Sequence, residues 1–139
     1  MFDLDPRLAA DTVPVGTLSL SRVLLMNDAR FPWLILVPAR AGLREIIDLP
    51  AVDRARLMEE ISLASSALAG LYGPDKLNIG ALGNIVAQLH VHLVARRVGD
   101  AAWPGPVWGA GQAQPYDAAA RARMLAALVP ALPGLVQAK

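Results

Sequence analysis

The chain has 139 residues, of which 55% are hydrophobic, so it is long enough for one domain with a substantial core and too apolar to be disordered. Its formal net charge of +1 provides no electrostatic footprint for nucleic acid or an anionic membrane surface. The absence of cysteine excludes disulfides, a thiolate nucleophile and cysteine-ligated zinc.

The N-terminal residues include Asp3 and Asp5 and lack the basic and apolar regions of a signal peptide. No apolar run approaches the ~20 residues that cross a bilayer. These features favour a protein of the cytoplasm. Residues 1–15 contain Pro6 and Pro14 and are predicted to be irregular or to form a short edge strand.

Two strands are predicted next. Residues 17–26 begin with clean polar–apolar alternation and end apolar, and residues 33–37 form a continuous apolar run short enough for a buried strand. Between them lie Asn27 and Asp28, which tolerate left-handed backbone and bond their own main chain. We therefore predict an antiparallel hairpin with a loop of about six residues.

A helix is predicted from Pro50, because the missing N–H of proline is no loss at a first helical position. Asp48 or Leu49 would cap it, and Asp is the better cap. Apolar residues recur at helical spacing and form a stripe that can pack on a sheet: Leu57, Ile61, Ala64, Leu68 and Leu71. The charged residues fall mostly off this stripe and are predicted to face solvent; they are Asp53, Arg54, Arg56, Glu59 and Glu60.

The second half of the chain is predicted to add two strands, a long loop and a last helix. Residues 77–80 are predicted to form a short strand, and a loop then leads into a central strand over 85–96. Residues 98–115 are rich in Gly and Pro and are predicted to be an irregular loop packed down by its two tryptophans. Asp117 is predicted to cap a last helix that ends at Leu128, with a loose tail beyond it.

The resulting element order predicts one α+β domain over residues 1–139. Its core spans about residues 17–104, and its last helix about 117–128. Short links favour antiparallel neighbours, so we expect an antiparallel sheet of about five strands with two helices packed on it.

The most informative stretch is the run from Gln88 to Val94, which alternates with period two like a half-buried strand. Because successive side chains of a strand point to opposite faces, Gln88, His90 and His92 are predicted to form a row on one face. His90 and His92 are the only two histidines of the chain.

Spacing alone leaves three interpretations of this row open. Two imidazoles on a strand can bind zinc or iron, but only Asp or Glu could supply a third ligand here. One imidazole can act as a nucleophile with its neighbour as an acid–base partner. The third interpretation is two ordinary hydrogen-bonded histidines, which is the most frequent outcome for so short a motif.

The run Gln88-Leu-His90-Val-His92-Leu-Val, followed by Ala95-Arg96, closely resembles the histidine triad motif of the HIT family, His-φ-His-φ-His-φ-φ with φ apolar. Gly83-Asn84-Ile85-Val86 is similar to the Gly-Gln-Ser/Thr-Val that commonly precedes that motif. The resemblance makes catalysis the preferred interpretation of the three.

The similarity extends over most of residues 20–104. The hairpin around Asn27 resembles the nucleotide-binding hairpin of the family, in which an Asp or Asn bonds the ribose hydroxyls. Asn78 falls near the position of a site-lining Asn, and Trp103-Pro104 is similar to a Trp-Pro found after the triad in one branch of the family.

The resemblance implies a HIT-like fold and a nucleotidyl hydrolase or transferase that acts at the α-phosphate of a nucleoside phosphoramidate or dinucleoside polyphosphate. His90 would be the nucleophile that forms a nucleotidyl-histidine intermediate. His92 would bond the phosphate or the leaving group and help to move protons. The nucleotide-binding residues would be Asn27, Asn78 and Asn84. The implied partners are a purine nucleotide and a second copy of the chain, with neither a metal nor another cofactor.

The sequence departs from the family pattern at four positions. Gln88 stands at the first triad position and is counted with His90 and His92 among the catalytic residues that the resemblance implies, but it can only hydrogen-bond and not titrate, which leaves it a positioning role. Ile85 stands where many members have a hydroxyl, Asn84 is shorter than the usual Gln, and Leu34 stands where another His is common. Two hypotheses therefore remain: an active enzyme, or a nucleotide-binding or sensing module with little or no catalysis.

Overall fold

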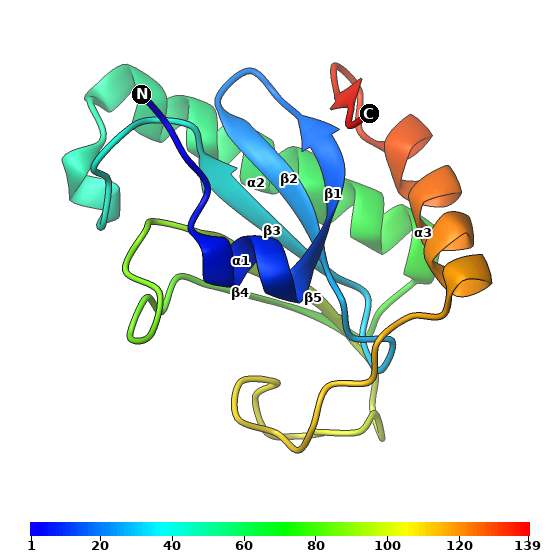
Figure 1. The fold of residues 1–139 in the computed structure, drawn as a ribbon. Helices are drawn as coiled ribbons and strands as arrows, with labels where there is room; N and C mark the ends of the chain where they lie inside the picture. Colours follow the sequence, from blue (N-terminus) through cyan, green and yellow to red (C-terminus); the bar gives the residue numbers. More distant parts are fainter.

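The computed structural model describes residues 1–139, and a single sheet lies at its centre (Figure 1). The sheet has six strands in the order β4-β5-β3-β2-β1-β6. Their bounds are β1 Thr12–Thr17, β2 Ser21–Met26, β3 Trp33–Pro38, β4 Lys76–Gly80, β5 Val91–Arg96 and β6 Val136–Gln137. All neighbours pair antiparallel. The predicted α+β fold is thus confirmed, with six strands where about five were expected.

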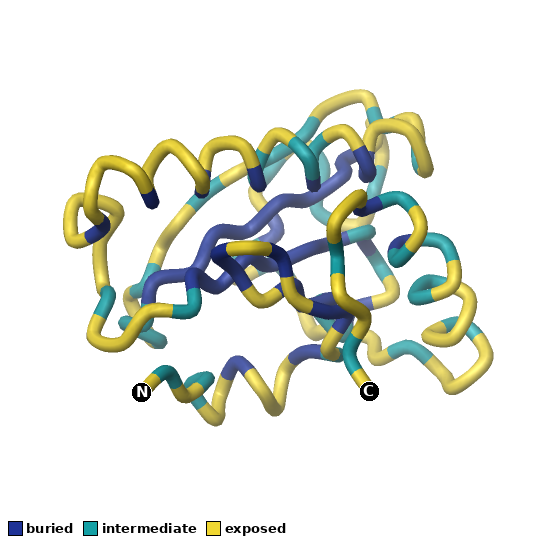
Figure 2. The backbone as a smooth tube through the Cα atoms, turned by 90° about the horizontal axis from the view of Figure 1, so that it is seen from above, coloured by how far each residue is buried: buried dark blue, intermediate teal, exposed yellow.

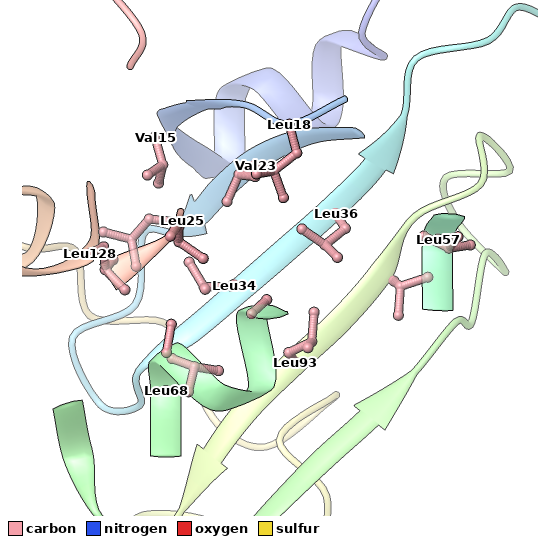
Figure 3. Packing of buried hydrophobic residues seen from close by; sticks show 14 of the residues in the cluster. Val15, Leu18, Val23, Leu25, Leu34, Leu36, Leu57, Leu68, Leu93 and Leu128 are labelled. Atoms are coloured by element: carbon pink, nitrogen blue, oxygen red, sulfur yellow. The ribbon is translucent and has the colours of Figure 1, made fainter. Parts of the chain in front are cut away.

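Two long helices, α2 (Ala51–Tyr72) and α3 (Ala118–Ala131), cover one face of the sheet. The main core lies between them and the sheet, and Leu34 and Leu93 belong to it (Figure 3). A short helix, α1 (Pro6–Asp11), packs on the opposite face, and a 3-10 turn, η1 (Ile46–Asp48), precedes α2. Figure 2 shows α2 and the N-terminal segment on opposite sides of the buried strands.

The N-terminal segment is more ordered than the sequence suggests. Pro6 begins α1, and the Asp5 carboxylate caps the helix by accepting a hydrogen bond from the backbone nitrogen of Arg7 at 2.8 Å. Leu8 is buried in the second core cluster, beside Trp33. Residues 6–11 therefore form a helix that was not predicted, and residues 12–15 belong to β1, so the expected short strand is present while the irregular alternative fails from Pro6 onward.

The stretch at 17–26 is not one strand. β1 ends at Thr17 and β2 begins at Ser21, and the backbone nitrogen of Leu18 donates to the Ser21 carbonyl oxygen at 2.8 Å to close the turn. The next hairpin is confirmed, because β2 and β3 pair antiparallel across residues 27–32.

The central strand is shorter than predicted. β5 begins at Val91, and residues 85–90 lie outside the sheet. Leu89 donates its backbone N–H to the Leu43 carbonyl oxygen at 3.0 Å, in the connection before η1, and to no neighbouring strand. Gln88 and His90 thus precede β5, and only His92 lies on it.

The C-terminal tail is not loose. Val136 and Gln137 form β6 and pair with Thr17 and Gly16 of β1. A Cβ at Gly16 would lie 2.4 Å from the Val136 carbonyl oxygen, so only glycine allows this approach.

Helix α2 differs from the prediction at its start and on its polar side. Pro50 is the cap, and the helix begins at Ala51. The carboxylates of Asp53 and Glu60, which were expected to face solvent, are buried. Glu60 accepts a hydrogen bond from the backbone nitrogen of Leu20 at 2.7 Å, which ties α2 to the β1–β2 turn.

Most of the remaining predictions agree with the structure, but the last helix continues past its predicted end at Leu128 to Ala131, and Leu71 of the predicted α2 stripe is 40% exposed. The strand at 77–80 is β4, and residues 98–115 contain no helix or strand. Asp117 caps α3 by accepting from the backbone nitrogen of Ala120 at 2.7 Å. None of the helices is both long enough and apolar enough to span a membrane.

Candidate active site

The sheet places His92 on the face that α2 does not cover. β3 and β5 pair with Ile35 opposite His92, so both side chains point to the same face. Trp33, two residues before Ile35 on β3, points to this face as well and is a diagonal neighbour of His92.

The two histidines come together although only one is on the strand. The ring centroids of His90 and His92 are 4.8 Å apart, and both side chains are buried. The prediction that the two imidazoles meet is therefore confirmed, but the regular strand row that was expected to align them is absent before Val91.

The backbone determines how His90 is protonated. Nδ1 of His90 lies 2.6 Å from the carbonyl oxygen of Gln88. A carbonyl oxygen only accepts hydrogen bonds, so Nδ1 must carry the proton. The Nε2 atom of a neutral His90 then keeps its lone pair, which is the state that a nitrogen nucleophile requires.

His92 is surrounded by aromatic rings. The indole Nε1 of Trp33 donates to Nδ1 of His92 at 3.0 Å. The ring of Trp108, from the loop after β5, lies 5.4 Å from that of His92 at an interplanar angle of 81°. Burial in this apolar setting, together with the repulsion between the two imidazoles if both were protonated, lowers the pKa of His92 to about 4.

A cavity of about 650 Å³ lies beside His92. Its walls come from the end of α1, the β2–β3 hairpin, the loop before β5 and the loop after it. The polar and aromatic groups among its lining residues are Asp11, Asn27, Asp28, Arg30, Trp33, Asn84, His92 and Trp108. His90 borders a smaller hollow next to it, and Leu82 and Gly83 line both.

The side chain of Gln88 is directed to the N-terminal segment. Its Oε1 accepts from the backbone nitrogen of Asp5 at 2.9 Å, and its Nε2 donates to the carbonyl oxygen of Asp3 at 2.8 Å. Arg7 adds a third link by donating to the Ile85 carbonyl oxygen at 3.0 Å. The first triad position thus anchors residues 3–7 beside the histidines.

The three asparagines expected at the site have different surroundings. Asn27 and Asn84 line the cavity. Asn27 also accepts from the backbone nitrogen of Tyr116 at 3.0 Å. Asn78 does not line the cavity, contrary to expectation, because its Oδ1 accepts from the buried guanidinium of Arg96 at 2.8 Å.

Arg30 is one of the cavity residues that the sequence did not single out for the site. Arg30 is held by the buried carboxylate of Asp28 at 2.8 Å and donates to the Ala110 carbonyl oxygen at 2.7 Å. This contact joins the hairpin to the loop after β5. The arginine hydrogen bonds keep the pKa of Asp28 below its ordinary value even though burial opposes them.

Trp33 is another cavity residue that the sequence did not single out for the site. Leu34 was compared with a position that often holds another His, but Leu34 is fully buried on the α2 side of the sheet. Trp33 is the residue of β3 that contacts His92. A continuous apolar run gives no indication of which residues face the site, so only the pairing register could identify it.

No three His, Cys, Asp or Glu side chains are arranged so that they could hold a metal ion. The residues of the site offer two imidazoles, one with a free Nε2 lone pair, beside an open cavity lined by amide, guanidinium and indole groups.

Comparison with known proteins agrees with this geometry. Residues 7–99 match the model of the HIT domain family. A histidine triad (HIT) protein from Sinorhizobium meliloti has a similar crystal structure, with a TM-score of 0.93 and 50% identity over 95% of this chain and 98% of that one. The crystal structure of a histidine triad protein from Bradyrhizobium japonicum has a TM-score of 0.92 and 52% identity, over 94% of this chain and 98% of that one.

A histidine triad protein from Marinobacter aquaeolei has a TM-score of 0.95 and 49% identity, over 98% of this chain and 99% of that one. A search among curated proteins found no match. The family match covers well over half of the chain, and the three solved structures are about half identical to it along almost their full length. The chain therefore belongs to the HIT, or histidine triad, family.

Proposed function

We propose that this protein is a nucleotidyl hydrolase or transferase that acts at the α-phosphate of a purine nucleoside phosphoramidate or dinucleoside polyphosphate, with His90 as the nucleophile. The observation that carries the proposal is the 2.6 Å contact between Nδ1 of His90 and the Gln88 carbonyl oxygen. It holds the proton on Nδ1 and so leaves the Nε2 lone pair available for attack.

In the proposed reaction, Nε2 of His90 attacks the α-phosphorus and forms an N–P bond. The bond from phosphorus to the leaving nitrogen or oxygen breaks, and the leaving group takes its electron pair and a proton from a water molecule in the cavity. The hydroxide left by that water attacks phosphorus, the N–P bond breaks with its electron pair returning to Nε2, and the nucleoside monophosphate is released. Covalent catalysis of this kind divides one difficult displacement into two easier ones.

The nucleotide is proposed to occupy the 650 Å³ cavity, with its phosphates toward His92. Asn27 and Asn84 line this cavity and can bond the ribose or phosphate oxygens. Gln88 contributes through its carbonyl oxygen, which orients His90. Its side chain is occupied by Asp3 and Asp5, so we do not assign it a substrate contact.

The second candidate is a nucleotide-binding or sensing module with little or no catalysis. Two observations favour it. The side-chain amide of Gln88 has both ends engaged by the N-terminal segment, and Ile85 lines the cavity without offering any polar group. The site therefore has fewer side-chain groups for a phosphate than the family motif would supply.

One experiment separates the candidates. Release of AMP and GMP would be measured from a nucleoside phosphoramidate, a nucleotidyl-lysine analogue and dinucleoside polyphosphates, with a metal chelator present. Wild type and His90→Ala would be compared, with Arg121→Ala on the exposed side of α3 as a surface control. Release that is lost only in His90→Ala supports the enzyme. If neither wild type nor His90→Ala releases AMP or GMP and AMP raises the unfolding temperature, the binding module is favoured.

A homodimer is also part of the proposal. β4 is an edge strand with one unpaired side, and Ile79 on it is 48% exposed. An exposed apolar edge of this kind is suited to a second copy of the chain. Sedimentation of wild type and Ile79→Lys tests this proposal: we expect a dimer that the lysine converts to a monomer, and a monomeric wild type would refute it.

A further inference from the structure

We propose that Trp33 is a positioning residue that holds His92 as the neutral tautomer with its proton on Nε2, so that His92 is a fixed hydrogen-bond donor and not a proton shuttle. The tautomer follows from the chain alone. The role of the donor toward a phosphate rests on the proposed function.

The argument begins with the chemistry of the two groups. An indole nitrogen can only donate a hydrogen bond, because its lone pair belongs to the aromatic ring. The donor Nε1 of Trp33 lies 3.0 Å from Nδ1 of His92. That Nδ1 must then be an acceptor without a proton, and a neutral imidazole with a bare Nδ1 has its proton on Nε2.

The sheet makes this contact rigid. Trp33 and His92 lie on paired strands, β3 and β5, and point to the same face. Both residues are 5% exposed. Neither side chain can move away without disturbing strand pairing or the second core cluster, to which Trp33 belongs.

The surroundings of His92 disfavour its charged form. The rings of Trp33 and Trp108 lie 5.6 Å and 5.4 Å from it, and His90, the other imidazole, lies 4.8 Å away. The charged groups that line the same cavity are Asp11, Asp28 and Arg30, and none of them bonds to His92. The lowered pKa of His92, about 4, agrees with this setting.

The Gln88 carbonyl oxygen and the Trp33 indole thus impose opposite proton positions on the two histidines. The Gln88 carbonyl oxygen requires a proton on Nδ1 of His90, whereas Trp33 forbids one on Nδ1 of His92. One imidazole is left with a free Nε2 lone pair and the other with an Nε2–H donor. A permanent donor can stabilise the charge on a phosphate oxygen, while the proton for the leaving group comes from water in the cavity.

The test is nitrogen NMR on the full chain labelled with ¹⁵N. Because the chain has only two histidines, the His90→Ala variant leaves His92 as the only imidazole and assigns its signals. We expect the pattern of an Nε2–H tautomer at pH 7 and a coupling through the hydrogen bond between Trp33 Nε1 and His92 Nδ1. Both should persist down to about pH 5. A proton on Nδ1, or a titration of His92 near its ordinary pKa of 6.5, would overturn the proposal.

Two variants form a matched pair. Trp33→Phe keeps an aromatic ring but removes the donor, so we expect loss of the coupling, a shift of the His92 Nδ1 signal and a rise of its pKa. Trp108→Phe also changes an aromatic neighbour of His92, but it should leave the tautomer and the coupling intact. An unchanged His92 spectrum in Trp33→Phe would refute the proposal, and this outcome is independent of whether any nucleotide is hydrolysed.

An activity measurement extends the test. If wild type hydrolyses a substrate of the panel, Trp33→Phe should lower kcat with little change in KM, because the donor acts on developing charge. If wild type hydrolyses none of them, the proposed function fails for that panel, and the NMR experiment still decides the tautomer.

Discussion

Oε1 of Gln88 accepts a hydrogen bond of 2.9 Å from the backbone nitrogen of Asp5, although the two residues are 83 positions apart in the sequence. The residue at the first triad position therefore links the N-terminal segment to the turn that carries His90. Its own carbonyl oxygen holds His90 Nδ1, so one residue connects the segment to the proposed nucleophile.

Removing the Gln88 side chain should destabilise the packing of the N-terminal segment. Gln88→Ala deletes two hydrogen bonds, to Asp3 and Asp5, and we expect a loss of about 1–2 kcal/mol in the free energy of unfolding. Hydrogen exchange of the Asp5 amide should accelerate. Gln88→Glu keeps an acceptor for the Asp5 amide but sets a carboxylate oxygen against the Asp3 carbonyl oxygen, so it should destabilise the segment at least as much as Gln88→Ala. Unchanged exchange at Asp5 in Gln88→Ala would contradict the anchoring role.

Gly16 should be intolerant of a side chain. The Cβ of Gly16→Ala would lie 2.4 Å from the Val136 carbonyl oxygen and 2.9 Å from the Leu135 side chain. We expect β6 to detach and the free energy of unfolding in urea to fall by about 1–3 kcal/mol. Gly70→Ala in α2 meets nothing within 4 Å and should instead stabilise by about 0.5–1 kcal/mol. Equal effects of the two variants would rule out the close approach as the cause.

Asn78 should matter for stability more than for ligand binding. Asn78→Ala removes the acceptor at 2.8 Å from the buried Arg96 guanidinium, which should cost about 2 kcal/mol. Since Asn78 does not line the cavity, the thermal shift produced by AMP should be retained. By contrast, Asn27→Ala should reduce that shift. A selective loss of AMP stabilisation in Asn78→Ala would instead place this residue at the ligand.

Acid should weaken the fold through Asp100. Its carboxylate accepts from Arg96 Nε at 2.7 Å and Nη2 at 2.9 Å, and these bonds lower the pKa of Asp100 from 3.8 to about 2. A lowered folded-state pKa means that the stabilisation is complete above pH 3.8 and is lost as the pH falls through about 2. Thermal unfolding of wild type should therefore decline across this window, and Asp100→Asn should show a smaller dependence. If the unfolding temperatures of wild type and Asp100→Asn fell equally with pH, Asp100 would not be the group responsible.

Local patterns in the sequence account for much of this architecture. The β2–β3 hairpin, the stripe of α2 around Leu57 and the cap at Asp117 were predictable, because each depends on residues a few positions apart. The pairing of His90 with His92 was predictable for the same reason. The division of residues 17–26 was not, since apolar residues flank the turn on both sides.

The environment of His92 and the anchoring of the Gln88 side chain depend on contacts between distant residues, which local patterns do not encode. The partners of Gln88 are more than 80 positions away, and Trp33 is 59 positions from His92. A shift of the β3–β5 register by one residue would turn Leu34 toward His92 and bury Trp33 under α2. Strand register therefore sets the protonation of His92, because it places the indole of Trp33 against its Nδ1, whereas the partner of His90 Nδ1 is the carbonyl oxygen of Gln88, only two residues away.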